Sequence, residues 1–504
     1  MTESDIAIIG AGFGGLGAAI QLKRSGTHDF VVFEQAAELG GTWRDNSYPG
    51  CACDVPSHLY SFSFALNPSW SDTFSGQAEI WDYLRGCADR FGIRPHLRLG
   101  CGVENAVWDD ASARWRLTTP AGEHLARVLV VATGPLSEPS IPDIPGLDTF
   151  AGTLFHSAGW DHGQDLAGRR VAVIGTGASA VQFVPEIQPV VASLTLFQRT
   201  PAWVIPRRSR RITGAERAAY RHVPGAQRFN RALIYWAREA LGYGFLHPRV
   251  NRLLQRAAEA HLRRQVRDPQ LRAKVTPRFV MGCKRILISN DYLPALGRPN
   301  VTVVTEAITE VHPDSVATAD GTTEVDTIIL GTGFRVTDMS VARHVIGRDG
   351  RTLADAWSPT MRAYLGTTVV GFPNLFVLLG PNTGLGHTSV VLMIESQLRH
   401  LLDVLAHQRR HGLVAMEPTE QAQRRWTELV DKRMAGTVWA QGGCVSWYLD
   451  ATGRNSTLWP GYATGFRLRL GRFRPGDYLV RTDTRPASGG TAKRDAVASQ
   501  GGTA

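Results

Sequence analysis

The sequence lacks most features that would place the protein outside a reduced, aqueous compartment. Its six cysteines are spread over 504 residues without a CxxC pair, so we expect no disulfide framework, no zinc site and no other metal centre. No apolar run approaches the roughly 18 residues of a membrane-spanning helix. The acidic start, Met1 to Asp5, has no room for the charged and apolar regions of a signal peptide. We therefore expect a cytoplasmic protein without stable membrane insertion.

Lysine is also scarce, because only five of the 55 basic residues are Lys. The excess of basic over acidic residues gives a net charge of +10 and a pI near 9.5, which suits nucleic acid, anionic membrane or anionic cofactors. The cations are scattered, and no zinc-finger or RNA-recognition pattern is present, so we expect no nucleic-acid partner. The charge favours phosphate-rich cofactors. The sequence does not indicate an oligomeric state.

Two glycine-rich segments each lie between a short apolar strand and a helical stretch. The first is Gly10 to Gly15, and the second is Gly175 to Ala180. In such a loop the first glycine makes a tight turn, the second lets the backbone approach a pyrophosphate, and the third position lets helix and strand touch. The strands expected around the loops are 5–9, 30–34, 171–174 and 194–197. The sequence thus predicts an α/β fold with two Rossmann-type dinucleotide-binding domains.

The residues that close the second strand of each unit favour different nucleotides. Glu34 ends the first unit, where a carboxylate accepts hydrogen bonds from ribose hydroxyls. The matching place in the second unit holds Gln198, followed by Arg199 and Thr200. A carboxylate there would repel a 2′-phosphate, whereas Arg199 offers a charge-assisted partner worth about 1.5–3 kcal/mol. We therefore expect FAD in the first unit and NADPH in the second. The alternative is that Arg199 only ends a strand in solvent.

The order of expected strands and helices and the apolar content along the chain divide it into three folded parts and a tail. We expect residues 1–145 to form the first part of the FAD-binding domain and residues 326–480 its second part. Residues 150–325 form the expected NADPH-binding domain. The tail, 482–504, has too little apolar content to pack and is expected to be disordered.

Long stretches rich in Arg, Ala and Leu predict a helical insertion in the NADPH-binding domain, at about 210–295. Apolar residues recur there at spacings of three and four. We expect that apolar face to pack in a core, with membrane association as the alternative. Its members are Leu233, Ile234, Trp236 and Leu241.

The segment from Phe150 to Asp161 matches the pattern FxGxxxHxxxW(P/D) at every fixed position. It resembles the fingerprint of type I Baeyer–Villiger monooxygenases. Further agreement occurs at Gly40 to Trp43, Tyr48 to Asp54, Met281 to Arg285 and Ser446 to Tyr448. The resemblance implies that FAD and NADPH use O₂ to form a C4a-peroxyflavin, which inserts one oxygen beside a ketone carbonyl to give an ester or lactone.

The same resemblance assigns expected roles to single residues. Arg285 matches the catalytic arginine, which stabilises negative charge during oxygen insertion, and Asp54 matches an acid that orients it. Lys284 matches a lysine that helps to recognise the 2′-phosphate beside Arg199 and Thr200. His156 is expected to be structural or part of a hinge. The residues expected to contact the cofactors are Gly10, Gly12, Gly14, Gly15, Glu34, Thr42, Trp43, Asp54, Tyr60, Val103, Thr176, Gly177, Ala178, Ser179, Gln182, Arg199, Thr200, Lys284 and Trp447, the last of which could equally be a core residue.

Other activities are open to a protein with two dinucleotide loops. Oxygenation at nitrogen or sulfur uses the same cofactors, although enzymes with that activity usually carry a different aromatic residue where Trp160 stands. A flavin disulfide reductase or an NADPH oxidase is a further alternative, since Cys51 and Cys53 lie close together, but we expect both to be packing residues. A nucleotide-binding module without activity is the last alternative. Linear, cyclic, aromatic and steroidal ketones all remain candidate substrates.

Overall fold

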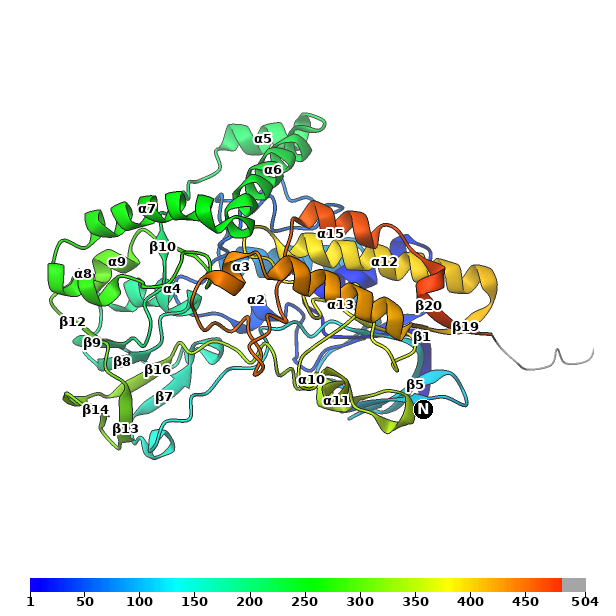
Figure 1. Ribbon diagram of the computed structural model, residues 1–504, viewed down its shortest axis with the longest axis horizontal. Helices are drawn as coiled ribbons and strands as arrows, with labels where there is room; N and C mark the ends of the chain where they lie inside the picture. The colour runs from blue at the N-terminus through cyan, green and yellow to red at the C-terminus, as the bar shows by residue number, and fades with distance from the viewer. Residues whose placement is uncertain (483–504) are drawn as a thin grey trace, which may run out of the picture.

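The computed structural model describes residues 1–482 and folds them around two separate β-sheets. Figure 1 shows the sheets toward opposite ends of the long axis, with β1 (Thr2–Ile9) in one and β8 (Arg170–Ile174) in the other. This arrangement confirms the expected α/β class with two Rossmann-type domains. The disorder expected for 482–504 concerns residues outside the described part, except Thr482, which ends β20 (Tyr478–Thr482).

The first sheet has the strand order β17-β4-β5-β6-β1-β2-β3, with β18 beside β6. Its parallel part carries the first glycine loop, because α1 (Phe13–Arg24) follows β1 directly. Ile6 and Ile8 are fully buried, as expected for a parallel strand covered on both faces. The other strands are β2 (Phe30–Phe33), β3 (Leu97–Arg98), β4 (Asn105–Asp109), β5 (Arg114–Thr119), β6 (Gly122–Val131), β17 (Val345–Ile346) and β18 (Leu375–Val377).

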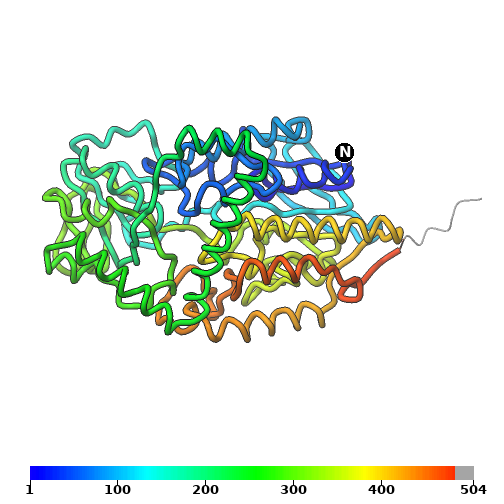
Figure 2. Tube along the Cα trace, turned by 90° about the horizontal axis from the view of Figure 1, so that it is seen from above, coloured from blue at the N-terminus to red at the C-terminus, as the bar shows by residue number. Residues whose placement is uncertain are grey.

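The carboxyl-terminal part of the chain returns to this first domain. Strand β18 pairs with β6, and α12 (Val390–His411) packs against both α1 and α15 (Ala463–Leu470). The side chain of Ser389 caps α12 by accepting a hydrogen bond from the backbone of Val391, and Gly412 ends the helix at φ +61°. Figure 2 shows α12, α13 (Glu420–Met434) and α15 running side by side. Segments from both ends of the chain therefore form one domain.

The second sheet is entirely parallel, with the order β12-β9-β8-β16-β7. The second glycine loop joins β8 to α4 (Ala178–Ile187). Strand β16 (Thr327–Leu330) pairs with both β7 and β8, so the boundary expected at 325/326 was wrong, and this domain continues through Leu330. A short buried strand has the same sequence pattern in either sheet, and its partners are not visible in the pattern. The other strands are β7 (Thr153–His156), β9 (Ser193–Phe197) and β12 (Val301–Val304), with an antiparallel group of β13 (Ile308–His312), β14 (Ser315–Thr318) and β15 (Gly321–Glu324) alongside.

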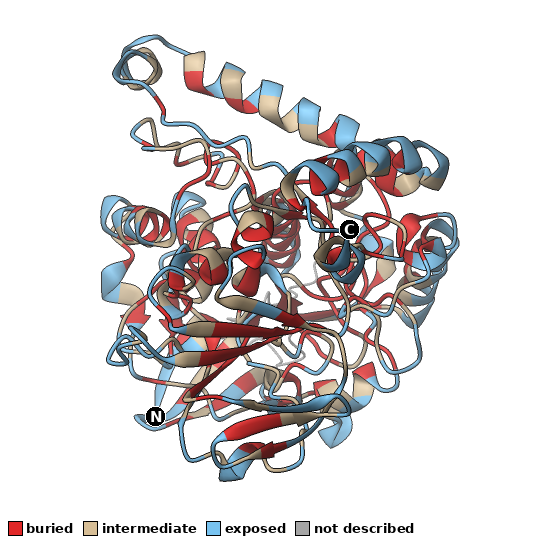
Figure 3. Ribbon diagram, turned by 90° about the vertical axis from the view of Figure 1, so that its left-hand side faces the viewer, coloured by how far each residue is buried: buried red, intermediate tan, exposed pale blue. Residues whose placement is uncertain are grey.

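The helical insertion contains α5 (Gly214–His222), α6 (Ala226–Leu246), α7 (Pro248–Gln265), α8 (Pro269–Val275) and α9 (Tyr292–Leu296). Helices α5 and α6 stand above the rest of the molecule in Figures 1 and 3. The expectation of a packed apolar face was wrong for three of its four residues. Leu233, Trp236 and Leu241 are 55%, 61% and 46% exposed, and only Ile234 packs against the core. Buried polar contacts, described below, fix the helix with this face outward.

The sequence predicts no disulfide framework, but the structure contains one disulfide. Cys283 and Cys444 form a disulfide, with their Cα atoms 6.2 Å apart. They are 161 positions apart in the chain, and only the fold brings them together. Cys51, Cys53, Cys87 and Cys101 are free. None of the helices in residues 1–482 combines the length and the apolar character needed to cross a membrane.

Candidate active site

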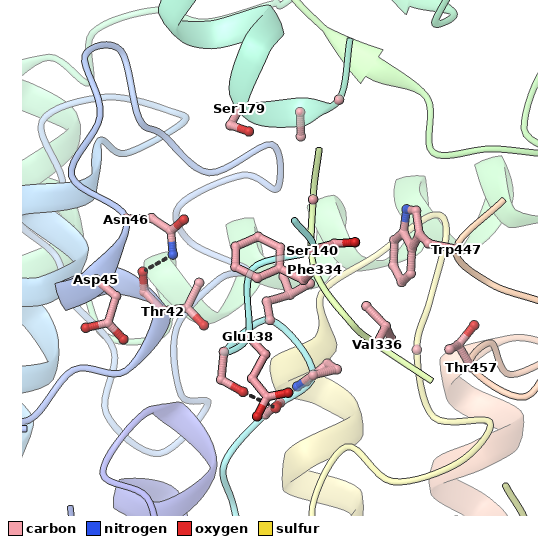
Figure 4. Close-up of a pocket in the computed structure, with 18 of the residues that line it drawn as sticks. Thr42, Asp45, Asn46, Glu138, Ser140, Ser179, Phe334, Val336, Trp447 and Thr457 are labelled. Atoms are coloured by element: carbon pink, nitrogen blue, oxygen red, sulfur yellow. Dashed lines mark hydrogen bonds between the residues drawn. The ribbon is translucent and has the colours of Figure 1, made fainter. Parts of the chain in front are cut away.

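A cavity of 1780 Å³ lies between the two domains, and both glycine loops open into it. Figure 4 shows Thr42 and Asn46 on one wall, Ser179 of α4 above them, and Trp447 and Thr457 on the opposite wall. Single-ligand pockets are usually about 300–1,000 Å³. The cavity therefore has room for more than one ligand.

The first glycine loop packs closely against neighbouring backbone, and two of its glycines leave no room for side chains. A Cβ atom at Gly10 would lie 2.7 Å from the carbonyl oxygen of Ala132, and one at Gly15 would overlap the carbonyl oxygen of Gly10. Gly10, Gly12 and Gly14 line the cavity, while Gly15 lies behind them, where α1 meets its strand. The amino end of α1 thus points its free N–H groups at the cavity, which favours a phosphate there.

Glu34 follows β2 and supports this loop. One carboxylate oxygen accepts a hydrogen bond from the backbone of Ala11 at 2.8 Å, and the other accepts from Ala36 at 3.0 Å. Arg44 adds an ion pair at 3.1 Å. A carboxylate offers about four lone-pair positions, so these contacts leave capacity for one further donor, such as a ribose hydroxyl. Glu34 is only 5% exposed and lines the cavity.

The second loop differs at the matching position. Gln198 is buried, and its side-chain amide donates to the carbonyl oxygen of Lys274 at 2.9 Å. It therefore anchors the insertion to the sheet, and no carboxylate follows β9. The Thr176 hydroxyl donates to the carbonyl oxygen of Thr200 at 2.9 Å, which fixes the glycine loop to the segment after the strand.

Two cations meet beside the second loop. Arg199 is exposed, Lys284 is half-buried, and both line the cavity. Burial lowers the pKa of Lys284, and the nearby positive charge of Arg199 lowers it further. Like charges held together are unfavourable until an anion binds between them. This pair therefore suits a phosphate group.

Arg285 and Asp54 form a two-point ion pair at the domain junction. Nε of Arg285 donates to Oδ2 of Asp54 at 2.8 Å, and Nη2 donates to Oδ1 at 2.7 Å. The carboxylate raises the pKa of Arg285 above its already high ordinary value, so the guanidinium stays charged. Tyr448 lies fully buried nearby, and burial raises its pKa to about 12, so its hydroxyl stays neutral.

The segment that carries Asp54 is tied to the second domain by Gln182 of α4. The amide oxygen of Gln182 accepts from the Tyr48 hydroxyl at 3.1 Å and from the backbone of Ala52 at 3.3 Å, and its nitrogen donates to the Ala52 carbonyl at 3.0 Å. The backbone just before Asp54 is thereby held against α4, and Asp54 itself lines the cavity. Across the same wall, the Trp43 indole donates to the Tyr60 hydroxyl at 3.0 Å.

Cys51 and Cys53 flank this pinned backbone and pack against the core of the first domain. Burial raises the pKa of Cys51 to about 11 and raises that of Cys53 as well. Since the thiolate is the reactive form, neither residue has the low pKa of a redox-active cysteine.

The fingerprint segment forms the edge strand β7 and the turn that follows it. The Trp160 ring packs 5.1 Å from Phe155 and 5.2 Å from Phe183 of α4, which ties the segment to the second glycine helix. Nδ1 of His156 accepts a hydrogen bond from the backbone of Ala158 at 3.0 Å, and its ring lies 5.9 Å from Phe334. Burial lowers the pKa of His156, so its ring stays neutral. These contacts are structural.

Trp447 lies on the cavity wall, 44% exposed, with its ring centroid 4.3 Å from that of Tyr448. The Cys283–Cys444 disulfide joins this segment to Lys284 and Arg285, which directly follow Cys283. A backbone hydrogen bond of 3.1 Å from Val280 to Gly442 runs alongside. The two cavity segments are therefore cross-linked.

The structure brings together every residue expected at the site except Gly15, whose place is behind the first loop. The predicted site residues do not include the cavity wall formed by the linkers between the domains, to which Glu138, Ser140 and Phe334 belong (Figure 4). The segment that ends in Gly331-Thr332-Gly333-Phe334 agrees with the family resemblance, but the sequence did not place it in the site. Within residues 1–482, no group of three His, Cys, Asp or Glu side chains could hold a metal ion.

Several buried polar atoms on the cavity wall have no partner within the protein. They are the hydroxyl oxygens of Thr133, Thr388 and Ser456. A buried hydroxyl without a hydrogen bond is costly. Together with the two glycine cradles and the paired cations, these atoms fit a cavity made for polar, phosphate-bearing ligands.

Residues 3–340 match the model of the flavin-binding monooxygenase-like family. The chain therefore belongs to the flavin-binding monooxygenases. A flavin-binding family agrees with the two glycine loops that open into the shared cavity.

Relatives covering nearly the whole chain narrow the class. The chain is 54% identical over 499 residues to a Baeyer–Villiger monooxygenase of Streptomyces coelicolor, covering 98% of this chain and 96% of that one. A cyclohexanone monooxygenase from Rhodococcus bound to NADP⁺ has a similar structure, with a TM-score of 0.84, 31% identity, and coverage of 95% and 99%. OTEMO in complex with FAD and NADP has a TM-score of 0.86, 28% identity, and coverage of 95% and 99%. The protein is a Baeyer–Villiger monooxygenase whose cofactors are FAD and NADPH.

Proposed function

We propose that the protein oxidises apolar ketones to esters or lactones, with Arg285 as the catalytic residue and Asp54 as its positioning partner. The observation that carries this assignment is the two-point ion pair at the domain junction, with both side chains lining the cavity. When bound, NADPH would supply the electrons and FAD would activate O₂, one atom of which goes to the ketone while the other leaves as water. We propose the cytoplasm as the place of reaction, which requires the Cys283–Cys444 disulfide to persist in a reducing compartment.

Arg285 keeps a fixed positive charge beside the reacting atoms. Oxygen insertion builds up negative charge on the ketone oxygen, and a preorganised cation in a water-poor site stabilises it. Asp54 weakens the field of Arg285 but holds one edge of its guanidinium, formed by Nε and Nη2. This contact sets the direction of the remaining N–H groups. Tyr448 stays neutral beside them and leaves this charge arrangement unchanged.

Arg199, Thr200 and Lys284 hold the 2′-phosphate of NADPH in this proposal. The binding of the phosphate relieves the repulsion between the two cations, which supports their joint role. The first loop, with Glu34 at its strand end, holds the FAD pyrophosphate and ribose. Thr42, Trp43, Tyr60 and Val103 complete that side of the cavity.

The substrate class follows from other side chains on the cavity wall. Met361, Leu385, Val445 and Leu458 are large and apolar, and none of them can hydrogen-bond a polar substrate tail. A site of this kind favours ketones with hydrocarbon substituents, and it discriminates between them mainly by size.

The assignment is tested with Arg285→Ala. We expect flavin reduction by NADPH to continue while ester formation falls by about 100-fold or more, because a preorganised charge of this kind is worth that much. Stopped-flow flavin absorbance and product analysis by mass spectrometry give the two rates. Arg278→Ala, at an exposed arginine of the same loop, is the matched control and should change neither. Full ester formation in Arg285→Ala would remove Arg285 from the chemistry.

A further inference from the structure

Helix α6 presents its apolar side to solvent. Phe229, Leu233, Trp236 and Tyr243 are 67%, 55%, 61% and 47% exposed. At about 100° per residue, these four side chains fall within one stripe about 80° wide along the helix. Exposed alanines at 232, 237 and 240 lie in or beside the stripe. The helix is therefore amphipathic with its apolar side outward.

The polar side of α6 faces inward and is firmly bound. Arg231 is buried and donates from Nη1 to the carbonyl oxygen of His58 at 2.5 Å. Glu239, 4% exposed, accepts hydrogen bonds from the backbone of Ala463 and Thr464, each at 3.1 Å, at the start of α15. His387 contacts the same carboxylate at 3.0 Å. Turning the helix to bury its apolar stripe would break all of these contacts and leave charges unpaired.

Helix α7 extends the apolar surface. Val250, Leu253 and Leu254 are 38%, 62% and 41% exposed, and Leu254 packs against Gly244 near the end of α6. Together with Leu241, the two helices hold eight of the 20 large exposed apolar side chains of residues 1–482. We refer to these residues, 229–254 on α6 and α7, as the helical face. Scattered apolar residues are ordinary, whereas such a concentration marks a binding surface.

The charge around the helical face is of one sign. Arg228, Arg249, Arg252 and Arg256 are exposed on or beside it. Between 223 and 258 the sole acidic residue is Glu239, which is buried. A second copy of the chain placed against this face around a two-fold axis would bring arginines against arginines. An anionic surface is the complement that this charge requires.

We propose that the helical face docks on the surface of an anionic lipid bilayer. Trp and Tyr with aliphatic neighbours suit the boundary between headgroups and acyl chains, and the arginines suit anionic headgroups. The docking is peripheral, because no helix in the described part of the chain can cross a membrane.

This docking site would also lie close to the cavity. Gly242 of α6 packs directly against the ring of His387, and the neighbouring residues Leu385 and Thr388 line the cavity wall. Apolar compounds concentrate in bilayers for the same reason that apolar side chains are buried. Docking would therefore bring the enzyme to a source of the apolar ketones proposed above, although the docking itself does not depend on that substrate assignment.

The experiment is vesicle flotation with the full-length, flavin-loaded protein. Vesicles of phosphatidylcholine alone are compared with vesicles of equal parts phosphatidylcholine and phosphatidylglycerol. We expect flotation with the anionic vesicles, weakened by added salt. F229S/L233S/W236S should lower the apparent affinity by about tenfold or more, because it removes three inserting side chains. R249Q/R252Q/R256Q should remove the preference for phosphatidylglycerol.

The control variant V190S/L479S/V480S removes three apolar side chains that lie elsewhere and are 52–54% exposed, and it should float like the wild type. Flavin absorbance and NADPH oxidation should be unchanged in all variants. If the triple variant loses its flavin, the single variant W236S replaces it in the flotation experiment. A wild type that does not float with anionic vesicles would overturn the proposal. Sedimentation velocity tests whether a second copy of the chain binds the helical face instead. A wild-type dimer that F229S/L233S/W236S converts to monomer, without vesicle binding, would assign the face to that second copy.

Discussion

The two dinucleotide units of this protein share a fold and differ where their second strands end. The first unit ends in Glu34, whose carboxylate is tied to Ala11 and Ala36. The second ends in Gln198, which turns inward to Lys274, followed by Arg199, which faces the cavity beside Lys284. In the proposed assignment the glycine loops hold the pyrophosphates, and these end residues distinguish the two nucleotides by their charge. On this proposal, nucleotide choice is set by a few charges outside the shared fold.

The largest effect is expected when an alanine replaces one glycine in either of the two glycine loops. In Gly15→Ala the new Cβ would overlap the Gly10 carbonyl oxygen, so we expect loss of bound flavin and therefore of all turnover, with a destabilisation of about 1–3 kcal/mol as for other overpacked sites. Gly175→Ala would overlap Gly331 in the second unit and should keep its flavin while losing NADPH turnover. Flavin absorbance and thermal melting measure the two outcomes.

Gly86→Ala is the matched control, because its Cβ meets no atom within 4 Å in helix α3 (Gln77–Arg90). It should keep both flavin and turnover. If Gly175→Ala lost its flavin as readily as Gly15→Ala, the separation of the two units into a flavin site and a nicotinamide site would be wrong.

Cutting the cross-link beside the second unit is expected to have the next largest effect. Cys444→Ser removes a disulfide that closes a long loop, and losing such a bond costs about 2–5 kcal/mol of unfolding free energy. Since the disulfide joins the Trp447 segment to Lys284 and Arg285, KM for NADPH should also rise while flavin content stays constant. Dithiothreitol should lower the Tm of the wild type but not that of Cys444→Ser. Equal melting of both proteins with and without reductant would show that the disulfide contributes nothing.

The preference for NADPH over NADH tests the difference between the residues that follow β2 and β9. Arg199→Glu replaces a partner of the 2′-phosphate by a carboxylate that repels it, and it should lower the ratio of kcat/KM for NADPH to that for NADH by about 10- to 100-fold. Steady-state NADPH and NADH oxidation gives this ratio. Arg298→Glu, an exposed arginine elsewhere in the same domain, should leave it unchanged. An unaltered ratio in Arg199→Glu would exclude contact with the 2′-phosphate.

The smallest expected effect is a pH dependence. Only the charged form of Lys284 attracts the 2′-phosphate, and burial and Arg199 lower its pKa below that of an ordinary lysine. As the pH rises through this lowered pKa, the charge is lost, so KM for NADPH should rise in the alkaline range before an ordinary lysine titrates, near pH ~10.4. KM for NADH should not follow, and Lys284→Arg should flatten the NADPH profile. Identical profiles for both coenzymes would place Lys284 away from the phosphate.

The features that could be predicted best from the sequence are those determined by short, contiguous motifs. The two glycine loops, the strands beside them and the segments around Asp54 and Arg285 could all be located, because each depends on local spacing. The cavity then brings these motifs together from both domains. The fold class was predictable for the same reason, since each βαβ unit is local in the chain.

Features that depend on long-range pairing escaped prediction. Strand β16 was placed in the wrong domain because a buried strand does not reveal its partners, and the Cys283–Cys444 disulfide joins residues far apart in the chain. The prediction for the orientation of α6 was wrong for a different reason. An amphipathic pattern predicts a helix with one apolar side, but only the buried contacts of Arg231 and Glu239 determine which side faces outward.

We propose that two nucleotide sites with different charges serve one ketone-oxidising centre at Arg285. The most direct test supplies the purified enzyme with NADPH, isotopically labelled O₂ and a panel of apolar ketones, and analyses the products by mass spectrometry. We expect the wild type to form esters or lactones that carry one labelled oxygen atom, and we expect these products to be nearly absent with Arg285→Ala. Unchanged ketones beside labelled N- or S-oxides from added amines and sulfides would contradict it.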